Sequence, residues 1–154
     1  MKRDTRCWQL SGHWVGRVGL LASRGAFELP LSGESVPAGF PSPAEEYLET
    51  PLDLNAYVAP RPEATFFVRA SGDSMIGAGI YHDDILVVDR SQQPQQGNVV
   101  IAFLDGEFTV KRLARSCDGD LVLAPENPEF SPILLTPETD FEIWGVVRHV
   151  IHKV

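Results

Sequence analysis

The sequence predicts a mainly β protein, with a body of short, twisted, mostly antiparallel strands behind a flexible N-terminal arm. From Thr65 onward, short runs of β-branched and aromatic residues alternate with Gly, Pro, Asp and Asn. Residues 1–30 show neither a helical nor a strand period. Between these regions, "LSGESVPAGFPSP" at residues 31–43 has the Ser, Gly and Pro content typical of an extended connector.

One short helix is expected between the connector and the strands. In "SPAEEYLE" at residues 42–49, Ser42 is a candidate N-cap, Pro43 occupies the first helical position and Glu45 follows three residues after the cap. These residues satisfy the free amides of a helix start. Pro51 then ends the helix.

Six strands are expected after this helix, because each segment is short, apolar and bounded by turn residues. They are "TFFVRA" (65–70), "DILVVD" (84–89), "NVVIAFL" (98–104), "EFTVKRLA" (107–114), "LVLA" (121–124) and "FEIWGVVRHVI" (141–151). Asp105 and Gly106 separate the third from the fourth strand, and this pair favours a type I′ turn. The two flanking strands should therefore pair antiparallel.

Composition indicates an ordinary globular chain rather than a membrane protein. The 154 residues are 44% hydrophobic and 22% charged, and no run approaches the roughly 18 to 20 apolar residues that span a bilayer. The N-terminal segment is basic and mildly apolar, but Gln9, Ser11, His13 and Arg17 interrupt any signal-peptide core. We therefore expect a cytoplasmic protein without membrane attachment.

The cysteines and histidines give little support to a metal site or a disulfide. Cys7 and Cys117 lie far apart and outside any Cys/His spacing. His149 and His152 could share one face of a helix, but the surrounding pattern predicts a strand, so ordinary packing is favoured. We expect no metal and no cofactor.

The formal net charge of −8 is unevenly distributed. Residues 1–38 carry five basic and three acidic groups, giving +2, whereas residues 39–154 carry eight and eighteen, giving −10. An acidic surface repels phosphate backbones, so tight direct nucleic-acid binding by this region is not expected. Other proteins are its expected partners.

Ser74 lies in "ASGDSM" after an apolar run, where it is either an ordinary turn hydroxyl or a nucleophile. The α/β-hydrolase elbow requires one glycine two positions before the serine and another two positions after it. Gly72 occupies the first of these positions, but Ile76 occupies the second. The β-lactamase spacing would require lysine where Gly77 stands. Neither template fits.

A base for Ser74 could be a histidine or a lysine. A triad of His82 with Asp83, Asp84 or Asp89 is disfavoured, because "YHDD" is a predicted turn in which His82 is solvated. Lys111 lies inside a predicted apolar strand, and desolvation could lower its pKa by the roughly three units that a base near neutrality needs. From the residues alone, a lysine at a strand edge beside Arg112 remains the alternative.

Several motifs in order closely resemble the LexA and UmuD family of self-cleaving serine peptidases. They are "FPSPAEEYLETPLDLN", "ASGDSM", "GEFTVKRL", "NPEFSPI" and "GVVRHVI", and the resemblance covers about residues 36–152. The 37-residue separation of Ser74 and Lys111 also matches. The resemblance implies a LexA-like peptidase body with Ser74 as nucleophile, Lys111 as general base and the Asp73 and Ser74 amides as candidates for the oxyanion hole.

The resemblance also implies a cleavage site between Ala38 and Gly39, which would separate an arm of residues 1–38 from a peptidase and interaction domain of residues 39–154. Alanine suits a shallow pocket, and glycine lets the backbone approach the serine closely. Pro37 departs from the family pattern, since it removes an N–H that could bind the cleft. Slower cleavage is one expected consequence.

The function implied is a role in the SOS response to DNA damage. In this family a recombinase filament on single-stranded DNA promotes cleavage, and the shortened homodimer joins an error-prone Y-family polymerase in translesion synthesis. A LexA-like repressor is disfavoured, because 38 residues lack the paired helices of a DNA-binding domain. A signal-peptidase-like enzyme is also disfavoured, because the sequence contains no segment that could form its membrane-anchoring helix. A non-enzymatic polymerase accessory that keeps Ser74 and Lys111 as a remnant remains an alternative. The sequence does not decide between cleavage within one chain and between chains.

Overall fold

The structure, a computed structural model, describes residues 9–10, 13–14, 28–31 and 50–154. The chain divides into two compact units, one of residues 20–60 and one of the remaining residues, and each is considered by itself. The helix expected over residues 42–49 lies outside the described residues. So do the N-terminal cysteine and the expected cleavage site.

The first unit contains a short helix that the sequence analysis missed. Strand β3 (Glu28–Leu29) pairs antiparallel with β4 (Leu52–Asp53), and α1 (Leu54–Val58) follows directly. The Asp53 carboxylate accepts hydrogen bonds from the Asn55 and Ala56 amides at 2.9 and 3.3 Å, which caps the helix start. The signal was present in the sequence as an N-cap aspartate before a helix-compatible run.

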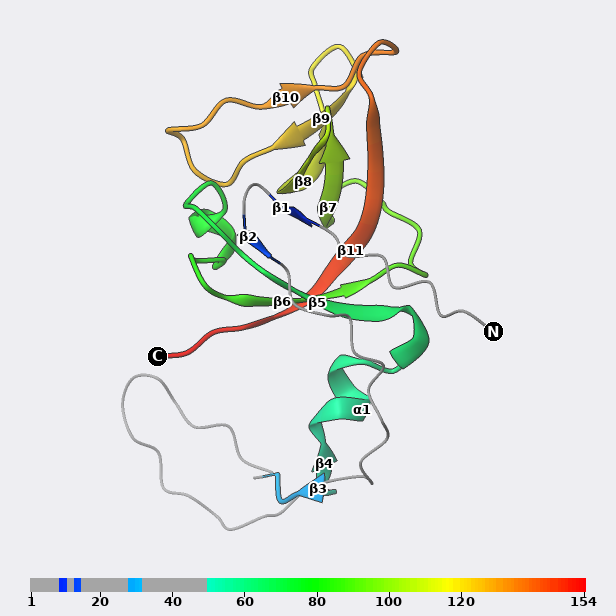
Figure 1. The fold of residues 1–154 in the computed structure, drawn as a ribbon, viewed down its shortest axis with the longest axis vertical. Helices are drawn as coiled ribbons and strands as arrows, with labels where there is room; N and C mark the ends of the chain where they lie inside the picture. The colour runs from blue at the N-terminus through cyan, green and yellow to red at the C-terminus, as the bar shows by residue number, and fades with distance from the viewer. Residues whose placement is uncertain (1–8, 11–12, 15–27, 32–49) are drawn as a thin grey trace. The chain divides into compact units, whose positions relative to one another are not determined.

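The second unit is built on a seven-stranded sheet in which every neighbouring pair is antiparallel (Figure 1). The strand order is β10-β9-β8-β7-β11-β6-β5. The strands are β5 (Thr65–Arg69), β6 (Ile85–Asp89), β7 (Val99–Leu104), β8 (Glu107–Arg115), β9 (Leu121–Ala124), β10 (Ile133–Leu134) and β11 (Phe141–Ile151). The mainly β, antiparallel fold class is therefore confirmed, as are all six expected strands. Two-residue β10 was not predicted.

Four smaller elements complete the described part of this unit. β1 (Gln9–Leu10) pairs antiparallel with β2 (His13–Trp14), and the 3₁₀ helices η1 (Pro62–Ala64) and η2 (Ile76–Ala78) lie before β5 and after Ser74. The expected hairpin is present between β7 and β8. Asp105 and Gly106 have φ values of 47° and 92°, as a type I′ turn requires.

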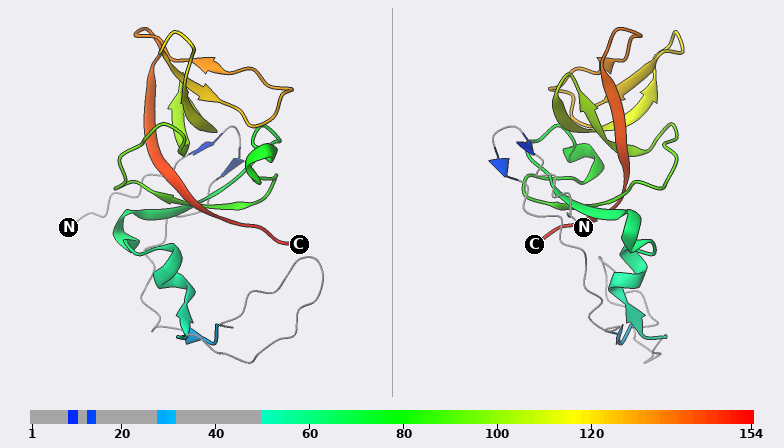
Figure 2. Two further views of the ribbon diagram at one scale, coloured as in Figure 1. Left: turned by 180° about the vertical axis from the view of Figure 1, so that it is seen from behind. Right: turned by 45° about the vertical axis from the view of Figure 1, so that its right-hand side comes forward.

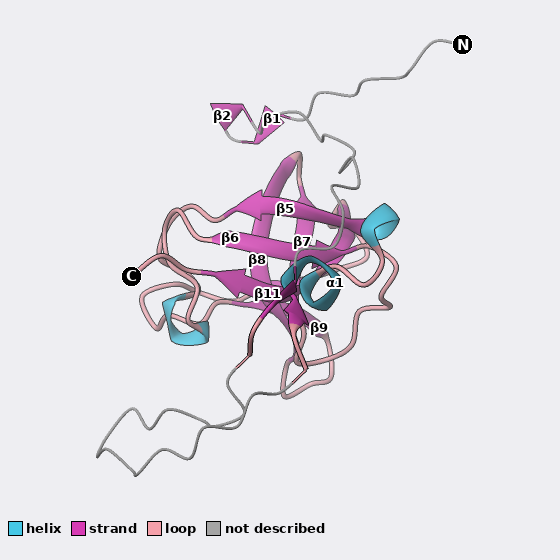
Figure 3. Cartoon of the chain, turned by 90° about the horizontal axis from the view of Figure 1, so that it is seen from below, coloured by secondary structure: helices cyan, strands magenta, loops and turns pink. Residues whose placement is uncertain are grey.

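Strand β11 connects two differently oriented parts of the sheet. Its pairing with β7 shifts register between Ile143 and Gly145, and its pairing with β6 shifts between Val147 and His149. Such bulges bend a strand and increase its twist. As a result β5 and β6 run crosswise to β7 and β8, and β11 passes from one part to the other (Figures 1, 2 and 3).

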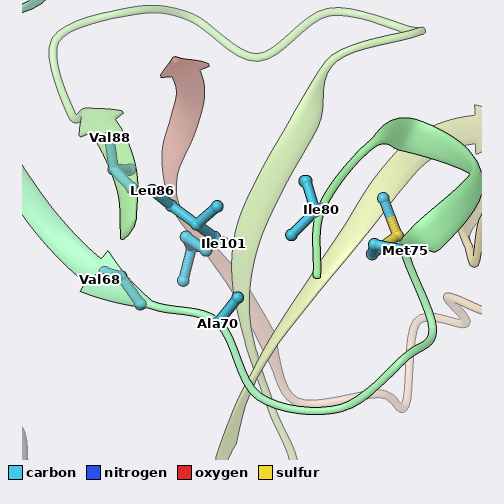
Figure 4. Packing of buried hydrophobic residues seen from close by; sticks show 7 residues of the cluster. All are labelled: Val68, Ala70, Met75, Ile80, Leu86, Val88 and Ile101. Carbon is cyan, nitrogen blue, oxygen red and sulfur yellow. The ribbon is translucent and has the colours of Figure 1, made fainter. Parts of the chain in front are cut away.

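Buried side chains form two clusters that share β7, with Ile101 in one cluster and its neighbours Val100 and Ala102 in the other. One cluster is centred on Val100, Leu113 and Leu123 of β7, β8 and β9. The other contains residues of β5, β6 and β7 together with Met75 and Ile80, which flank the short helix η2 (Figure 4). Met75 and Ile80 thus anchor the segment that carries Ser74 to the hydrophobic core.

Candidate active site

Ser74 lies on a turn that joins β5 to β6 and is fixed at both its base and its tip. At the base, the Ala70 amide donates to the Asp84 carbonyl at 2.8 Å, and the Asp83 amide donates to the Ala70 carbonyl at 3.0 Å. At the tip, the Met75 side chain is 1% exposed and packs in the core (Figure 4). The residue after the serine therefore anchors it, which gives a physical reason for methionine in the Ser-Met dipeptide.

Lys111 approaches this turn from β8, where it is paired with Val100 of β7. Only 8% of the residue is exposed. Its Nζ lies 2.9 Å from the Ser74 Oγ, 3.0 Å from the Thr109 Oγ1 and 3.0 Å from the Val110 carbonyl oxygen. The two residues that the sequence analysis selected from positions 37 residues apart are thus in direct hydrogen-bond contact.

Either form of the amine can make these three contacts. The ammonium form has three N–H donors, whereas a neutral lysine has two N–H donors and one lone pair. In the neutral form, the two N–H groups can donate to the Val110 carbonyl and the Thr109 hydroxyl, which leaves the lone pair for the Ser74 hydroxyl proton. A 2.9 Å separation of Oγ and Nζ is within the range for proton transfer.

The surroundings of Lys111 also favour the uncharged form. Burial lowers the pKa of Lys111 below the usual value for lysine, because a desolvated ammonium loses its hydration. Among the described residues, no carboxylate lies within ion-pair distance of its Nζ to compensate for that loss. A buried lysine without a counter-charge is the usual environment of a catalytic base.

The Asp73 and Ser74 amides, expected at the oxyanion hole, lie at the nucleophile turn itself. In the part of the chain that the structure describes, neither amide donates a hydrogen bond. The carbonyl groups on this turn are held instead. The Asp73 carbonyl accepts from the Asn127 Nδ2 at 3.0 Å, and the Ser74 carbonyl accepts from the Glu126 amide at 2.8 Å.

The disfavoured serine–histidine triad is not assembled in the structure. The His82 side chain is 63% exposed, and its Nδ1 accepts a hydrogen bond from the Gly72 amide at 3.3 Å rather than from Ser74. Asp84 is bound by the Tyr81 amide and by His152, whose Nδ1 lies 2.7 Å from its Oδ1. These contacts lower the pKa of Asp84, the Tyr81 amide most. His152 therefore packs against the base of the Ser74 turn.

Three further observations concern features other than the serine–lysine pair. No cluster of three or more His, Cys, Asp or Glu side chains with metal-binding geometry occurs within residues 50–154 and the shorter described segments. Across the same residues, no helix has the length and apolar character needed to cross a bilayer. Cys117 is exposed and unpaired by any disulfide there.

Sequence reasoning found Ser74 and Lys111 but missed Thr109 and Asn127. Thr109 lies two positions before Lys111 on the same strand, so both side chains point to one face, and this period-2 spacing could have identified it. Asn127 is separated from Asp73 by 54 residues, and no local pattern joins them. The predicted scissile bond between Ala38 and Gly39 lies outside the described residues.

An antiparallel β body with a serine hydroxyl against a buried lysine amine has the design of a serine peptidase, and comparison with known proteins supports that class. The chain belongs to the Peptidase S24-like family, which matches residues 30–148. Protein ImpA of Salmonella typhimurium is 53% identical over 124 residues, covering 80% of this chain and 83% of that protein.

Two other relatives extend the comparison. Protein MucA of Escherichia coli is 41% identical over 140 residues, covering 86% of this chain and 92% of that protein. The LexA repressor of Dechloromonas aromatica (strain RCB) is 44% identical over 124 residues, which cover 80% of this chain and 60% of the repressor. The expected membership of the LexA and UmuD family is confirmed, and with it the UmuD-like function in the response to DNA damage.

Proposed function

We propose that this UmuD-like protein is an autocatalytic serine endopeptidase that cuts its own Ala38–Gly39 bond, with Ser74 as nucleophile and Lys111 as general base. The observation that supports this proposal best is the 2.9 Å contact between the Ser74 Oγ and the Nζ of a lysine that is 8% exposed. A serine hydroxyl needs a base to become a nucleophile, and a desolvated amine can serve as that base near neutral pH.

The first half of the reaction is acyl transfer. The Ser74 Oγ attacks the Ala38 carbonyl carbon while its proton passes to the Lys111 Nζ, and the resulting oxyanion binds the Asp73 and Ser74 amides. When the tetrahedral intermediate breaks down, the Lys111 ammonium returns the proton to the Gly39 nitrogen. This step frees the α-amino group of Gly39, and residues 1–38 become an ester on the Ser74 Oγ of the chain that made the cut, which is either the same chain or a second copy.

The second half is hydrolysis of that ester. Neutral Lys111 accepts a proton from a water molecule, which attacks the Ala38 carbonyl carbon and forms a second tetrahedral intermediate. Its breakdown returns the proton to the Ser74 Oγ and releases the arm as a carboxylic acid. Throughout the cycle, Thr109 and the Val110 carbonyl hold the amine in the same orientation.

The proposed partners follow the confirmed family rather than any surface of the described residues. A recombinase filament on single-stranded DNA would promote cleavage, and the shortened protein would act as a homodimer with a Y-family error-prone DNA polymerase subunit in the cytoplasm. Removing residues 1–38, which carry +2, leaves a product of 116 residues with a formal charge of −10. Loss of a covering segment is a general means of changing which protein a surface binds.

The direct test is incubation of the purified full-length chain at mildly alkaline pH, followed by mass spectrometry and N-terminal sequencing. We expect a fragment that begins at Gly39. Ser74→Ala and Lys111→Ala should stay intact, whereas Ser71→Ala should cut normally, because Ser71 is an exposed serine on the same turn. An intact wild-type chain after prolonged incubation with activated filament would favour the non-enzymatic accessory. Cleavage by Ser74→Ala at the same bond would assign the chemistry to another residue.

A further inference from the structure

Residues 126–127, which follow β9, contact the Ser74 turn on both sides of the serine. The Glu126 amide donates to the Ser74 carbonyl at 2.8 Å, and the Gly77 amide donates to the Glu126 carbonyl at 2.7 Å. The Asn127 Nδ2 donates to the Asp73 carbonyl at 3.0 Å. Asn127 is only 7% exposed, so a loss of this hydrogen bond would not be replaced easily by water.

The two segments approach each other at backbone distance. A Cβ atom at Gly77 would lie 2.5 Å from the Glu126 carbonyl oxygen, which is closer than real Cβ contacts allow. Glu126 is held in turn by an ion pair with Arg112 of β8. The Ser74 turn is therefore fixed against the strand that carries Lys111 through residues 126–127.

The Asn127 side chain has a defined orientation, because both ends of its amide are used. Its Oδ1 accepts a hydrogen bond from the Glu129 amide at 3.0 Å, while its Nδ2 donates to Asp73. A flipped side chain would place an oxygen against the Asp73 carbonyl and an NH₂ group against the Glu129 N–H. Only the observed orientation satisfies both partners.

Fixing the Asp73 carbonyl also fixes the amide of the next residue. The peptide bond between Asp73 and Ser74 is trans, as no cis peptide occurs in the described chain. In a planar trans peptide the C=O and N–H groups point in opposite directions. The Asp73 carbonyl also accepts from the Ile76 amide at 3.4 Å, a longer contact within the turn. Asn127 supplies the shorter hydrogen bond from outside the turn, so the Ser74 N–H is directed away from Asn127 and cannot rotate without breaking that bond.

We propose that Asn127 is a positioning residue for the oxyanion hole: by binding the Asp73 carbonyl, it orients the Ser74 amide toward the substrate oxygen. This inference rests on the proposed self-cleavage, in which that amide stabilises the tetrahedral intermediates. Among the described residues, Asn127 makes no hydrogen bond to the Ser74 hydroxyl or to Lys111. Its effect is to remove the rotation of one peptide plane that would otherwise accompany formation of the oxyanion.

The variant that isolates this effect is Asn127→Asp. Aspartate keeps the oxygen that accepts from Glu129, and so keeps the turn, but replaces the donor to Asp73 with a repelling oxygen. Asn98→Asp is the matched control. Asn98 accepts from the Gln95 amide at 2.9 Å in the same manner, so the control adds the same charge and preserves the same kind of turn.

The self-cleavage rate of each full-length variant is measured across pH, and the plateau rates at high pH are compared. A new carboxylate near Lys111 could raise the pKa of the lysine, but the plateau is reached only after that proton is lost. We expect the Asn127→Asp plateau to fall by about 10- to 100-fold, since loss of a whole oxyanion donor costs about 100- to 1,000-fold. Asn98→Asp should keep the wild-type plateau. A wild-type plateau for Asn127→Asp overturns the inference.

A second readout does not depend on cleavage. In uncut Lys111→Ala chains labelled with ¹⁵N, addition of Asn127→Asp should shift the Ser74 amide resonance and change its hydrogen-exchange rate, whereas addition of Asn98→Asp should not. An unchanged Ser74 amide overturns the positioning role, whatever the rates. A wild-type chain that is never cleaved overturns the proposed function instead. In that case the resonance and hydrogen-exchange rate of the Ser74 amide still test whether Asn127 orients the Ser74 peptide.

Discussion

At the scale of single residues, Lys111 combines two properties that oppose each other. Its burial makes the amine a usable base, and the same burial lowers the stability of the fold at neutral pH, because the unfolded chain carries the charged amine in water. The hydrogen bonds to Thr109, Val110 and Ser74 reduce the cost without supplying a negative charge. Activity and stability should therefore respond to pH through the same group.

The rate of self-cleavage should rise with pH and reach a plateau. Only the neutral amine accepts the Ser74 proton, so the active fraction grows as Lys111 loses its own proton. Because burial lowers the pKa of Lys111, the midpoint should lie below the ordinary lysine value of about 10.4. The measurement is the first-order appearance of the fragment that begins at Gly39, from pH 6 to pH 11. A rate that does not change over this range contradicts a lysine base.

Replacing Lys111 with methionine should stabilise the fold at neutral pH, by an amount that shrinks as pH rises. The pKa of Lys111 is lowered in the folded chain and lies near 10.4 in the unfolded chain. At pH values between these two pKa values, the unfolded wild-type chain binds more protons than the folded chain. The free energy of unfolding of the wild type therefore increases with pH in this range. Methionine fills a similar volume and does not titrate. Urea unfolding of Ser74→Ala and Ser74→Ala/Lys111→Met should give free energies of unfolding that converge toward pH 10. A difference that is constant with pH contradicts a buried, titrating amine.

The sequence led to Ser74 and Lys111, the pair proposed to react, because each has a local signal and the family resemblance joins the two. Ser74 occurs in a Ser-Met dipeptide after an apolar strand, and Lys111 interrupts an otherwise apolar strand. Asn127 leaves no such signal, since an asparagine before a proline in a loop is common in turns. Its role depends on a hydrogen bond across 54 residues, which only the folded chain reveals.

At the scale of elements, turn chemistry and strand composition predicted most of the sheet. The Asp105–Gly106 turn and the six apolar segments were found where expected, because each strand is bounded by residues that break it. β10 has only two residues and is formed by pairing with β9, so its own composition carries little information. The bulges in β11 were also not predicted, since they depend on two partner strands at once.

The close approach of β6 explains a glycine in the middle of the longest strand. A Cβ atom at Gly145 would lie 2.6 Å from the Val88 Cγ1 and 3.3 Å from the Asp89 carbonyl oxygen. Gly145→Ala should therefore lower the free energy of unfolding by about 1–3 kcal/mol through overpacking between β11 and β6. Urea unfolding of full-length chains in a Ser74→Ala background measures this change.

The compensating variant is Val88→Ala, which removes the Cγ1 atom that the new methyl group would contact. Each single substitution should destabilise the protein, but the double variant should be more stable than the sum of the two changes predicts. Strict additivity would mean that the cost at Gly145 arises elsewhere, for instance from the Asp89 backbone.

At the scale of the whole molecule, the described core and the proposed cleavage site belong to different parts of the sequence. The residues of both buried clusters lie between Phe66 and Val150, far downstream of the Ala38–Gly39 bond. The acidic charge is concentrated in the same downstream region, with −10 over residues 39–154. Cleavage should therefore change what the protein binds without rebuilding the sheet.

The product of cleavage should accordingly unfold at nearly the same temperature as the intact chain. Residues 39–154 retain both clusters, the seven-stranded sheet and the hydrogen bonds that fix the Ser74 turn. We expect the unfolding temperatures of full-length Ser74→Ala and of its 39–154 fragment to agree within about 3 °C, which corresponds to roughly 1 kcal/mol for a chain of this size. Calorimetry at one pH and equal molar concentration makes the comparison. A fall of about 10 °C or more would mean that residues 1–38 contribute substantially to the stability of the body, and the arm would then be a structural element rather than a removable one.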